Sequence, residues 1–393
     1  MARLSRRTLL LAGATAAGIG YAHWRGLRYP RLTWSPDDTA SSLDAVDWRG
    51  TFEQVIATPD RGLRAIGPNP ELLVQLKTAS ASISLNNVST QAQLSVQSDG
   101  ALQVDETIEG ITRRVQLKGQ SGGEVKLTWQ WRDQGQRQFA VIGDSGGGDE
   151  LTWCLQRAHA LGADFLLHLG DFNYAPDEYE SAINTFYSAE IPCFITIGNH
   201  DFNDKGLVYR HFLNYLGRFN HSFSIVGTQF LNIDTAASFF PVRGGQRGQF
   251  LNQLIPTKAP SIAFSHRPFV DIRAGEDHTL SSATEAEFLR ERLAFAGCTD
   301  YLCGHVHKSG ETDVDGLRQW TVGEGLGYED WVARKPVSQL LMGHITPGEA
   351  PRFEWADLAM PWAMHTSHEH LEKLLKEQPQ SVIDWYLQHR PTT

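Results

Sequence analysis

The sequence predicts an α/β domain preceded by a smaller all-β domain. Short polar strands with turn signals between them occupy residues 31–136, which is typical of an antiparallel β domain. From residue 137 onwards apolar runs alternate with helical patterns, which indicates βαβ units. The chain of 393 residues is too long for one average domain, and its hydrophobic content of 41% is enough for a sizeable core.

Residues 1–30 are predicted to be an export signal and linker. Arg6 and Arg7 precede a mildly apolar stretch at residues 11–22, and this arrangement resembles a twin-arginine signal. The resemblance implies the twin-arginine export machinery as a partner and a periplasmic or extracellular location. The stretch is too short and too rich in glycine and alanine for a stable membrane span. Residues 20–22 match a cleavage site only weakly, so the sequence also allows an uncleaved anchor. A second alternative is an ordinary helix that follows a basic start.

The net charge argues against one class of function, and the cysteine count argues against one class of fold. The formal net charge is -10, and no cluster of lysine and arginine follows the first residues, which argues against general nucleic-acid binding. Four cysteines are too few for a disulfide framework in a chain of this size. Cys193 and Cys303 lie in predicted core strands, where cysteine acts as a small apolar residue. In an exported protein the sequence still allows one disulfide.

The all-β domain, residues 31–136, is predicted to be an antiparallel sandwich of the immunoglobulin or fibronectin type III kind. Polar and apolar residues alternate at residues 94–96 and 125–131, and Asp99-Gly100 and Gly122-Gly123 mark turns. No group of metal-binding side chains gathers here, so we expect a packing or spacer domain.

The α/β domain is predicted to span residues 137–358, with a helical tail at residues 359–393. Its expected elements alternate in type along the chain. Strands are expected at residues 139–142, 164–169, 193–197, 261–264 and 300–303, helices at 149–161, 178–189, 207–216, 246–254 and 283–295, a hairpin at 223–233, mixed strand and loop beyond 316, and a tail helix at 369–377.

Polar side chains follow five of the predicted strands at the point where each strand ends. If these strands are neighbours in one sheet, their side chains converge on one crevice at its carboxyl edge. Aspartate, asparagine, tyrosine and histidine suit iron, zinc or manganese, and their number exceeds what one ion needs. Two ions sharing a carboxylate are therefore expected, a pair that can clamp an in-line displacement. The five blocks are Gly143-Asp144-Ser145-Gly146, Gly170-Asp171-Phe172-Asn173-Tyr174, Gly198-Asn199-His200-Asp201, Ala263-Phe264-Ser265-His266 and Gly304-His305-Val306-His307.

In this order the five blocks resemble the calcineurin-like metallophosphoesterase superfamily, over roughly residues 139–344. Two details resemble its purple acid phosphatase branch. Most of the superfamily has a histidine where this chain has Gly146, whereas the purple branch has a tyrosine at the place of Tyr174. The resemblance implies an α/β/β/α sandwich. It also implies a first metal held by Asp144, Asp171, Tyr174 and His307, and a second held by Asp171, Asn199, His266 and His305.

The resemblance also implies the metals and the reaction. A phenolate ligand at neutral pH needs a strong Lewis acid, so Fe(III) is expected beside a divalent iron, zinc or manganese. A metal-bound hydroxide would attack a small phosphate ester, as in an acid phosphomonoesterase. His200 would contact the phosphate, and Asp201 would orient the His200 side chain. The family's general-acid histidine falls on Gly275 here, and the nearest candidate is His278.

Several alternatives stay open from the sequence. The same site would serve a phosphodiesterase or nucleotidase, and a degenerate scaffold would only bind metal or phosphate. His168 is interpreted as a satisfied core histidine, and the glycines at residues 146–148 as room for the metal site. Trp320, Glu324 and Tyr328 either line a substrate groove or pack a loop.

Overall fold

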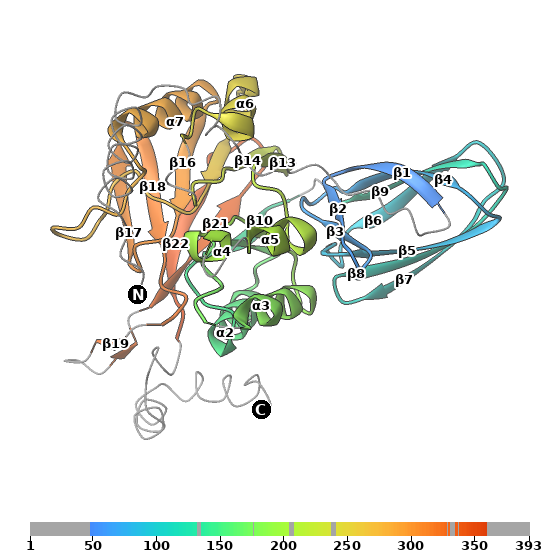
Figure 1. Ribbon diagram of the computed structural model, residues 1–393, viewed down its shortest axis with the longest axis horizontal. Coiled ribbons are helices and arrows are strands. Elements are labelled where there is room, and N and C mark those ends of the chain that lie inside the picture. The colour runs from blue at the N-terminus through green and yellow to red at the C-terminus, as the bar shows by residue number, and fades with distance from the viewer. Residues whose placement is uncertain are drawn as a thin grey trace, which may run out of the picture.

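The computed structural model describes residues 48–131, 135–175, 177–203, 208–236, 241–327, 329–330, 335–336 and 338–359 (Figure 1). The predicted export signal, the tail helix at residues 369–377 and Tyr328 lie outside these ranges. No helix within them is long and apolar enough to cross a membrane.

Two sheets face each other at the N-terminal end of the described chain (Figure 1). In β9 every second residue is buried, so one face of the strand packs inward, as the alternation predicts. The immunoglobulin or fibronectin type of this sandwich, and its limits in the chain, stay predictions. One sheet has the order β1 (Trp48–Glu53), β4 (Glu71–Leu76), β9 (Glu124–Gln130), β6 (Gln93–Ser98), and the other β2 (Val55–Ala57), β3 (Leu63–Ala65), β5 (Ser80–Asn86), β8 (Thr112–Lys118), β7 (Gln103–Glu109).

Two further sheets form the α/β part, with helices on their outer faces (Figure 1). A small pair, β19 (Glu329–Asp330) and β20 (Lys335–Pro336), lies apart. The first sheet has the order β12 (Cys193–Ile195), β11 (Phe165–His168), β10 (Arg137–Ile142), β21 (Gln339–Ile345), β22 (Arg352–Asp357). The second has the order β13 (His221–Ile225), β14 (Thr228–Asn232), β15 (Ser261–Phe264), β16 (Cys298–Cys303), β18 (Leu317–Val322), β17 (Ser309–Val314). The helices are α2 (Asp149–Ala160), α3 (Glu178–Tyr187), α4 (Asn199–Asn203), α5 (Tyr209–Tyr215), α6 (Gly245–Gln253) and α7 (Ala283–Phe295).

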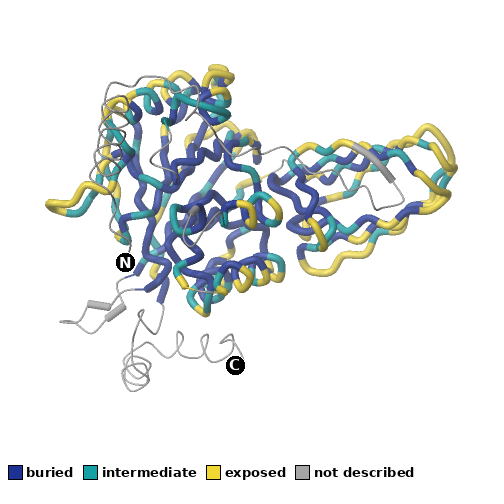
Figure 2. Tube along the Cα trace, viewed as in Figure 1, coloured by how far each residue is buried: buried dark blue, intermediate teal, exposed yellow. Residues whose placement is uncertain are grey.

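Aromatic side chains join the two sheets of the α/β part. Phe139 of β10 stacks on Phe165 of β11 at 5.1 Å between ring centroids. The edge of Phe230, from β14 in the other sheet, meets Phe139 at 5.5 Å. All three are fully buried, and the tube in Figure 2 is dark blue along these strands. The α/β/β/α layering therefore has its core between the two sheets.

The structure corrects one expectation about the donor-bearing strands. They do not belong to one sheet: β10, β11 and β12 lie in the first, and β15 and β16 in the second. Within each group the strands are parallel, so their carboxyl ends still meet at one edge. The stretch from Asn199 onwards forms the short helix α4. The disulfide that stayed open does not form, since all four cysteines are buried and free.

The sandwich and the α/β part are joined by buried polar contacts. Asn87, just beyond β5, pairs with the first residue of β12: the Cys193 amide donates to Asn87 Oδ1 at 2.8 Å, and Asn87 Nδ2 donates to the Cys193 carbonyl at 3.0 Å. Arg64 of β3 also donates to that carbonyl, at 3.2 Å. One cluster of buried apolar side chains continues from the sandwich into the α/β part. The two parts therefore share a core.

Candidate metal centre

Sharp backbone turns place the donors at the strand ends. Asp144, Asp171, His305 and His307 have φ of 57°, 59°, 73° and 48°, a left-handed conformation that is costly for residues with a side chain. Hydrogen bonds between neighbouring turns hold them there: the Asp144 amide donates to the Gly170 carbonyl at 2.9 Å. Strain of this kind at converging strand ends is typical of a functional site.

Glycine is needed where two of these turns touch. A Cβ at Gly198 would overlap the Asp171 carboxylate and backbone nitrogen, and a Cβ at Gly304 would overlap Asp144 Oδ2. The absence of side chains at these positions lets the turns approach to contact distance.

The first donor set consists of Asp144, Asp171, Tyr174 and His307. The Tyr174 hydroxyl lies 3.4 Å from Asp144 Oδ1, 3.4 Å from Asp171 Oδ2 and 3.1 Å from His307 Nε2. His307 Nε2 lies 3.4 Å from Asp144 Oδ1. All four predicted ligands of the first metal therefore point toward one another.

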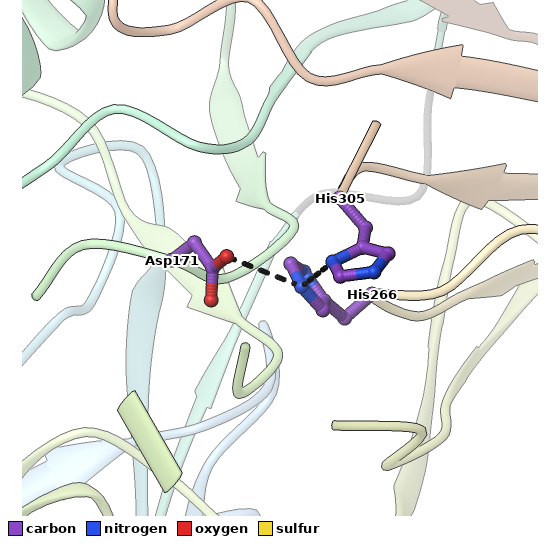
Figure 3. Close-up of side chains that lie close together, drawn as sticks. All are labelled: Asp171, His266 and His305. Atoms are coloured by element: carbon purple, nitrogen blue, oxygen red, sulfur yellow. Dashed lines mark hydrogen bonds and ion pairs between the residues drawn. The ribbon is translucent and has the colours of Figure 1, made fainter. Parts of the chain in front are cut away.

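The second donor set consists of Asp171, Asn199, His266 and His305. His266 Nε2 lies 3.4 Å from Asp171 Oδ2, 2.9 Å from Asn199 Oδ1 and 3.1 Å from His305 Nδ1. Figure 3 shows the His266 ring between Asp171 and His305. The other nitrogen of His266, Nδ1, lies 2.8 Å from the Leu169 carbonyl, which leaves Nε2 for a ligand.

These two sets fit a pair of metal ions. One carboxylate and two histidines of the second set, and two carboxylates and one histidine of the first, offer donor atoms within 4.8 Å of one another. Asp171 belongs to both groups, as a bridging ligand must. Carboxylate, imidazole, amide and phenol donors suit iron, zinc and manganese.

The charged groups of the site stabilise one another. Burial raises the pKa of Asp171, but His266 and His200 together lower it by more, so the net shift is downward. Burial lowers the pKa of His266, but Asp171 and Asp144 together raise it by more, to about 9. Burial raises the pKa of Asp144, and burial with His266 lowers the pKa of His305 to about 2. A cation would take the place of the proton shared by Asp171 and His266.

Tyr174 is placed by a loop whose anchor the sequence did not reveal. The Glu178 carboxylate accepts hydrogen bonds from the backbone amides of Tyr174 and Ala175, the second at 2.7 Å. Burial, with the Asp144 and Asp171 carboxylates, raises the pKa of the Tyr174 phenol. Ionising this phenol therefore needs a strongly charged cation beside it.

His200 lies at the site, whereas Asp201 has other partners than the prediction gave it. The His200 ring lies against Tyr174 at 4.4 Å between centroids, and its backbone amide donates to Asp171 Oδ1 at 2.9 Å. Asp201 was expected to orient that ring. In the structure its carboxylate accepts from the backbone amides of Asp171 at 2.7 Å, Phe172 at 2.9 Å and Gly198 at 2.8 Å. Asp201 thus joins two donor turns.

His278 lies at the border of the site. Its ring centroid is 5.8 Å from that of His305, and its side chain is half exposed. Its amide donates to the Asp271 carboxylate at 3.0 Å, which fixes the loop end. It contacts neither donor set through a hydrogen bond to a described residue.

The remaining candidates have structural roles. Neutral His168 is fully buried, with Nδ1 accepting from the Gly170 amide at 3.2 Å and Nε2 at 2.8 Å from Ser145 Oγ. Gly147 makes room for the backbone of Phe172 and Glu178 rather than for metal. The Glu324 carboxylate accepts from the amides of residues 309 and 339, which is loop packing. The Trp320 indole donates to Asp300 Oδ1 at 3.1 Å, inside the core.

Arg267 is a further residue of the site that sequence reasoning missed. It directly follows His266, and its Nη1 lies 2.7 Å from His305 Nε2. An arginine next to a predicted ligand was the available signal.

Comparisons with known proteins were made for the whole chain. Residues 137–309 match the family model of the calcineurin-like phosphoesterases. A search of curated protein sequences finds no match. The purple acid phosphatase PPD1 from yellow lupin (Lupinus luteus) seeds is similar with a TM-score of 0.50 and 11% identity, over 82% of this chain and 76% of that chain. The structure of PhoD has a TM-score of 0.42 and 11% identity, over 82% of this chain and 95% of that chain. The likeness to the lupin protein is one of fold.

Proposed function

Because this chain contains a calcineurin-like phosphoesterase domain at residues 137–309, we propose that it hydrolyses phosphate monoesters at acid pH with a pair of metal ions. The observation that carries the proposal is Asp171, which lies in both donor sets, with the Tyr174 hydroxyl beside it at 3.4 Å. A phenol in the donor set favours Fe(III) at the first position and leaves the second for a divalent ion.

Each group of the site would have a separate role in hydrolysis. Two cations held here would supply the charge that activates an attacking water and neutralises the phosphoryl oxygens. Asp201 keeps the Asp171 and Gly198 turns at a fixed separation through its backbone hydrogen bonds. His200, which lies partly exposed beside Tyr174, would donate to a phosphoryl oxygen. His278 at the border would protonate the leaving group.

The first test compares two substrates on the iron-loaded protein. We expect kcat/KM for p-nitrophenyl phosphate to exceed that for bis(p-nitrophenyl) phosphate by at least about tenfold, which corresponds to one charge-assisted contact. We also expect the optimum on the acid side of neutrality. A diester preference near neutral pH would instead indicate a phosphodiesterase. Bound metal with no turnover of either ester would contradict an enzymatic function.

The same preparation tests the role of Tyr174. A phenolate bound to Fe(III) absorbs visible light, so the Tyr174→Phe variant should lose that absorption while Tyr187→Phe keeps it. Tyr187 is a matched control because its hydroxyl donates to the Tyr215 carbonyl at 2.9 Å and belongs to neither donor set. A colourless wild-type protein holding only zinc, or colour that survives Tyr174→Phe, would refute the assignment.

A further inference from the structure

Arg267 has a backbone that is fixed at the second donor set. Its amide donates to Thr235 Oγ1 at 2.8 Å, and its carbonyl accepts from the Tyr301 hydroxyl at 2.6 Å. Thr235 and Tyr301 are both buried. These hydrogen bonds fix the position of the Arg267 Cα, one residue after His266. The Arg267 residue is only partly buried.

The Arg267 guanidinium, unlike several arginines of the α/β part, lacks a carboxylate partner among the described residues. No aspartate or glutamate among the described residues forms an ion pair with it, and its Nε is buried without a hydrogen-bond acceptor. A cation this close to a catalytic site, with donors still unused, is suited to an anion. The arginines that do have carboxylate partners include Arg243 with Glu285, Arg247 with Asp234, Arg273 with Asp271 and Arg318 with Asp300.

Arg267 contacts His305 through the ring nitrogen that lies outside the second donor set. Arginine can only donate, so His305 Nε2, at 2.7 Å, is the acceptor of this contact. The other ring nitrogen, Nδ1, lies 3.1 Å from His266 Nε2 in the second donor set.

His305 Nδ1 points into the second donor set, so a cation there would take its lone pair. The Arg267 guanidinium, 2.7 Å from Nε2 of the same ring, therefore lies one side chain away from that cation, with N–H groups still unused. We propose that Arg267 binds the phosphoryl group of the substrate.

The ligand class follows from the shape and charge of the guanidinium, and the inference rests on the proposed function. Arginine presents parallel N–H groups that match two oxygens of one phosphoryl group. A phosphate monoester or inorganic phosphate offers three such oxygens and up to two negative charges, whereas a diester offers two oxygens and one charge. Arg267 would therefore favour monoesters over diesters and would slow product release.

The test uses inorganic phosphate as the probe and calorimetry as the readout. Arg267→Met removes the guanidinium and its charge and keeps an unbranched apolar stem, and Arg273→Met is the matched control, because Arg273 lies in the same loop but is paired with Asp271. In metal-loaded protein we expect Arg267→Met to bind phosphate about 10- to 100-fold more weakly than wild type, with unchanged metal content. The control should bind as wild type does.

Two results would overturn the inference. Phosphate affinity that is unchanged in loaded Arg267→Met would show that the guanidinium does not touch the ligand. A loss of phosphate affinity that only follows a loss of metal would show that Arg267 supports His305 instead. The proposed function fails separately: a wild-type protein that binds phosphate through Arg267 but hydrolyses no ester would refute the function and leave this inference standing.

Discussion

His168 lies fully buried between two of the donor turns, and its hydrogen bonds fit only the neutral ring. Its Nδ1 accepts from the Gly170 amide, while Nε2 bonds to Ser145 Oγ, whose hydroxyl donates to the Gly146 carbonyl at 2.8 Å. A second ring proton on Nδ1 would point at the amide hydrogen. Burial lowers the pKa of His168 to about 3, against 6.5 for an ordinary histidine.

This shift predicts a loss of stability in acid. Between pH 6.5 and about 3 the unfolded chain binds a proton that the folded His168 does not, so folding stability falls as the pH falls. For one proton the slope is about 1.4 kcal/mol per pH unit. We expect His168→Gln to flatten the acid limb of the stability profile by about this slope. Denaturant unfolding of chelator-treated protein across this range measures it.

The control for this prediction is His159→Gln, since His159 is exposed on α2 and contacts no donor turn through a described hydrogen bond. It should leave the acid slope as in wild type. Equal slopes in wild type and His168→Gln would contradict the assignment of the acid sensitivity to His168.

The candidate metal ligands could be predicted from local sequence patterns. The residues that hold these ligands in place could not. Each donor follows a buried strand, and the order of residue types along the chain identifies the site. Asp201 is different, because its partners are backbone amides, two of them in a turn about 30 positions earlier. The acceptor of Arg267 lies 38 positions later in the chain. Contacts of this kind depend on how turns from different strands come together, which no local pattern records.

At the scale of single elements, the turn before α4 depends on Gly198. A Cβ there would overlap the Asp171 carboxylate and nitrogen, so Gly198→Ala must push the third donor turn away from the second. We expect a loss of about 1–3 kcal/mol in unfolding free energy and a metal affinity at least about tenfold lower, because Asp171 and Asn199 separate. Thermal unfolding and metal analysis on the same samples measure both.

Gly100→Ala is the matched control for this substitution, because nothing lies within 4 Å of a Cβ at Gly100. It should change neither property. Full metal content in Gly198→Ala would show that the close approach of the two turns is not needed for binding.

A helix or strand could be predicted where the sequence marks both of its ends. The helix expected at residues 283–295 is α7, because the Ser282 side chain accepts from the Glu285 amide at its start and Gly297 follows its end at φ 81°. The last strands were predicted only as mixed strand and loop. β21 and β22 pair antiparallel and add to the edge of β10, some 200 positions earlier in the chain, so their place depends on a distant partner.

For the whole molecule, the joint between the sandwich and the α/β part can be tested at Asn87. Its side chain makes two hydrogen bonds to Cys193 and one to the Ala65 carbonyl at 2.8 Å, from a backbone at φ 69°. Asn87→Gly keeps that backbone accessible and removes all three bonds. We expect a loss of about 1–3 kcal/mol in unfolding free energy, with one unfolding transition retained because the core is shared.

Gln97→Ala serves as the control, since Gln97 is exposed on β6, and should change stability little. If Asn87→Gly had wild-type stability, or if wild type unfolded in two separate transitions, the sandwich would be an independent spacer as the sequence suggested.

The donor sets connect parts of the chain that are far apart. The hydrogen bond from the His305 amide to Asp144 Oδ2 spans 161 positions, and the contact between Tyr174 and His307 spans 133. No single strand-and-helix unit carries a complete set, so a partly folded chain offers only fragments of a ligand shell. Retention of a metal pair would therefore record that both sheets have closed on each other. Metal content would separate fully folded molecules from partly folded ones before any substrate is added.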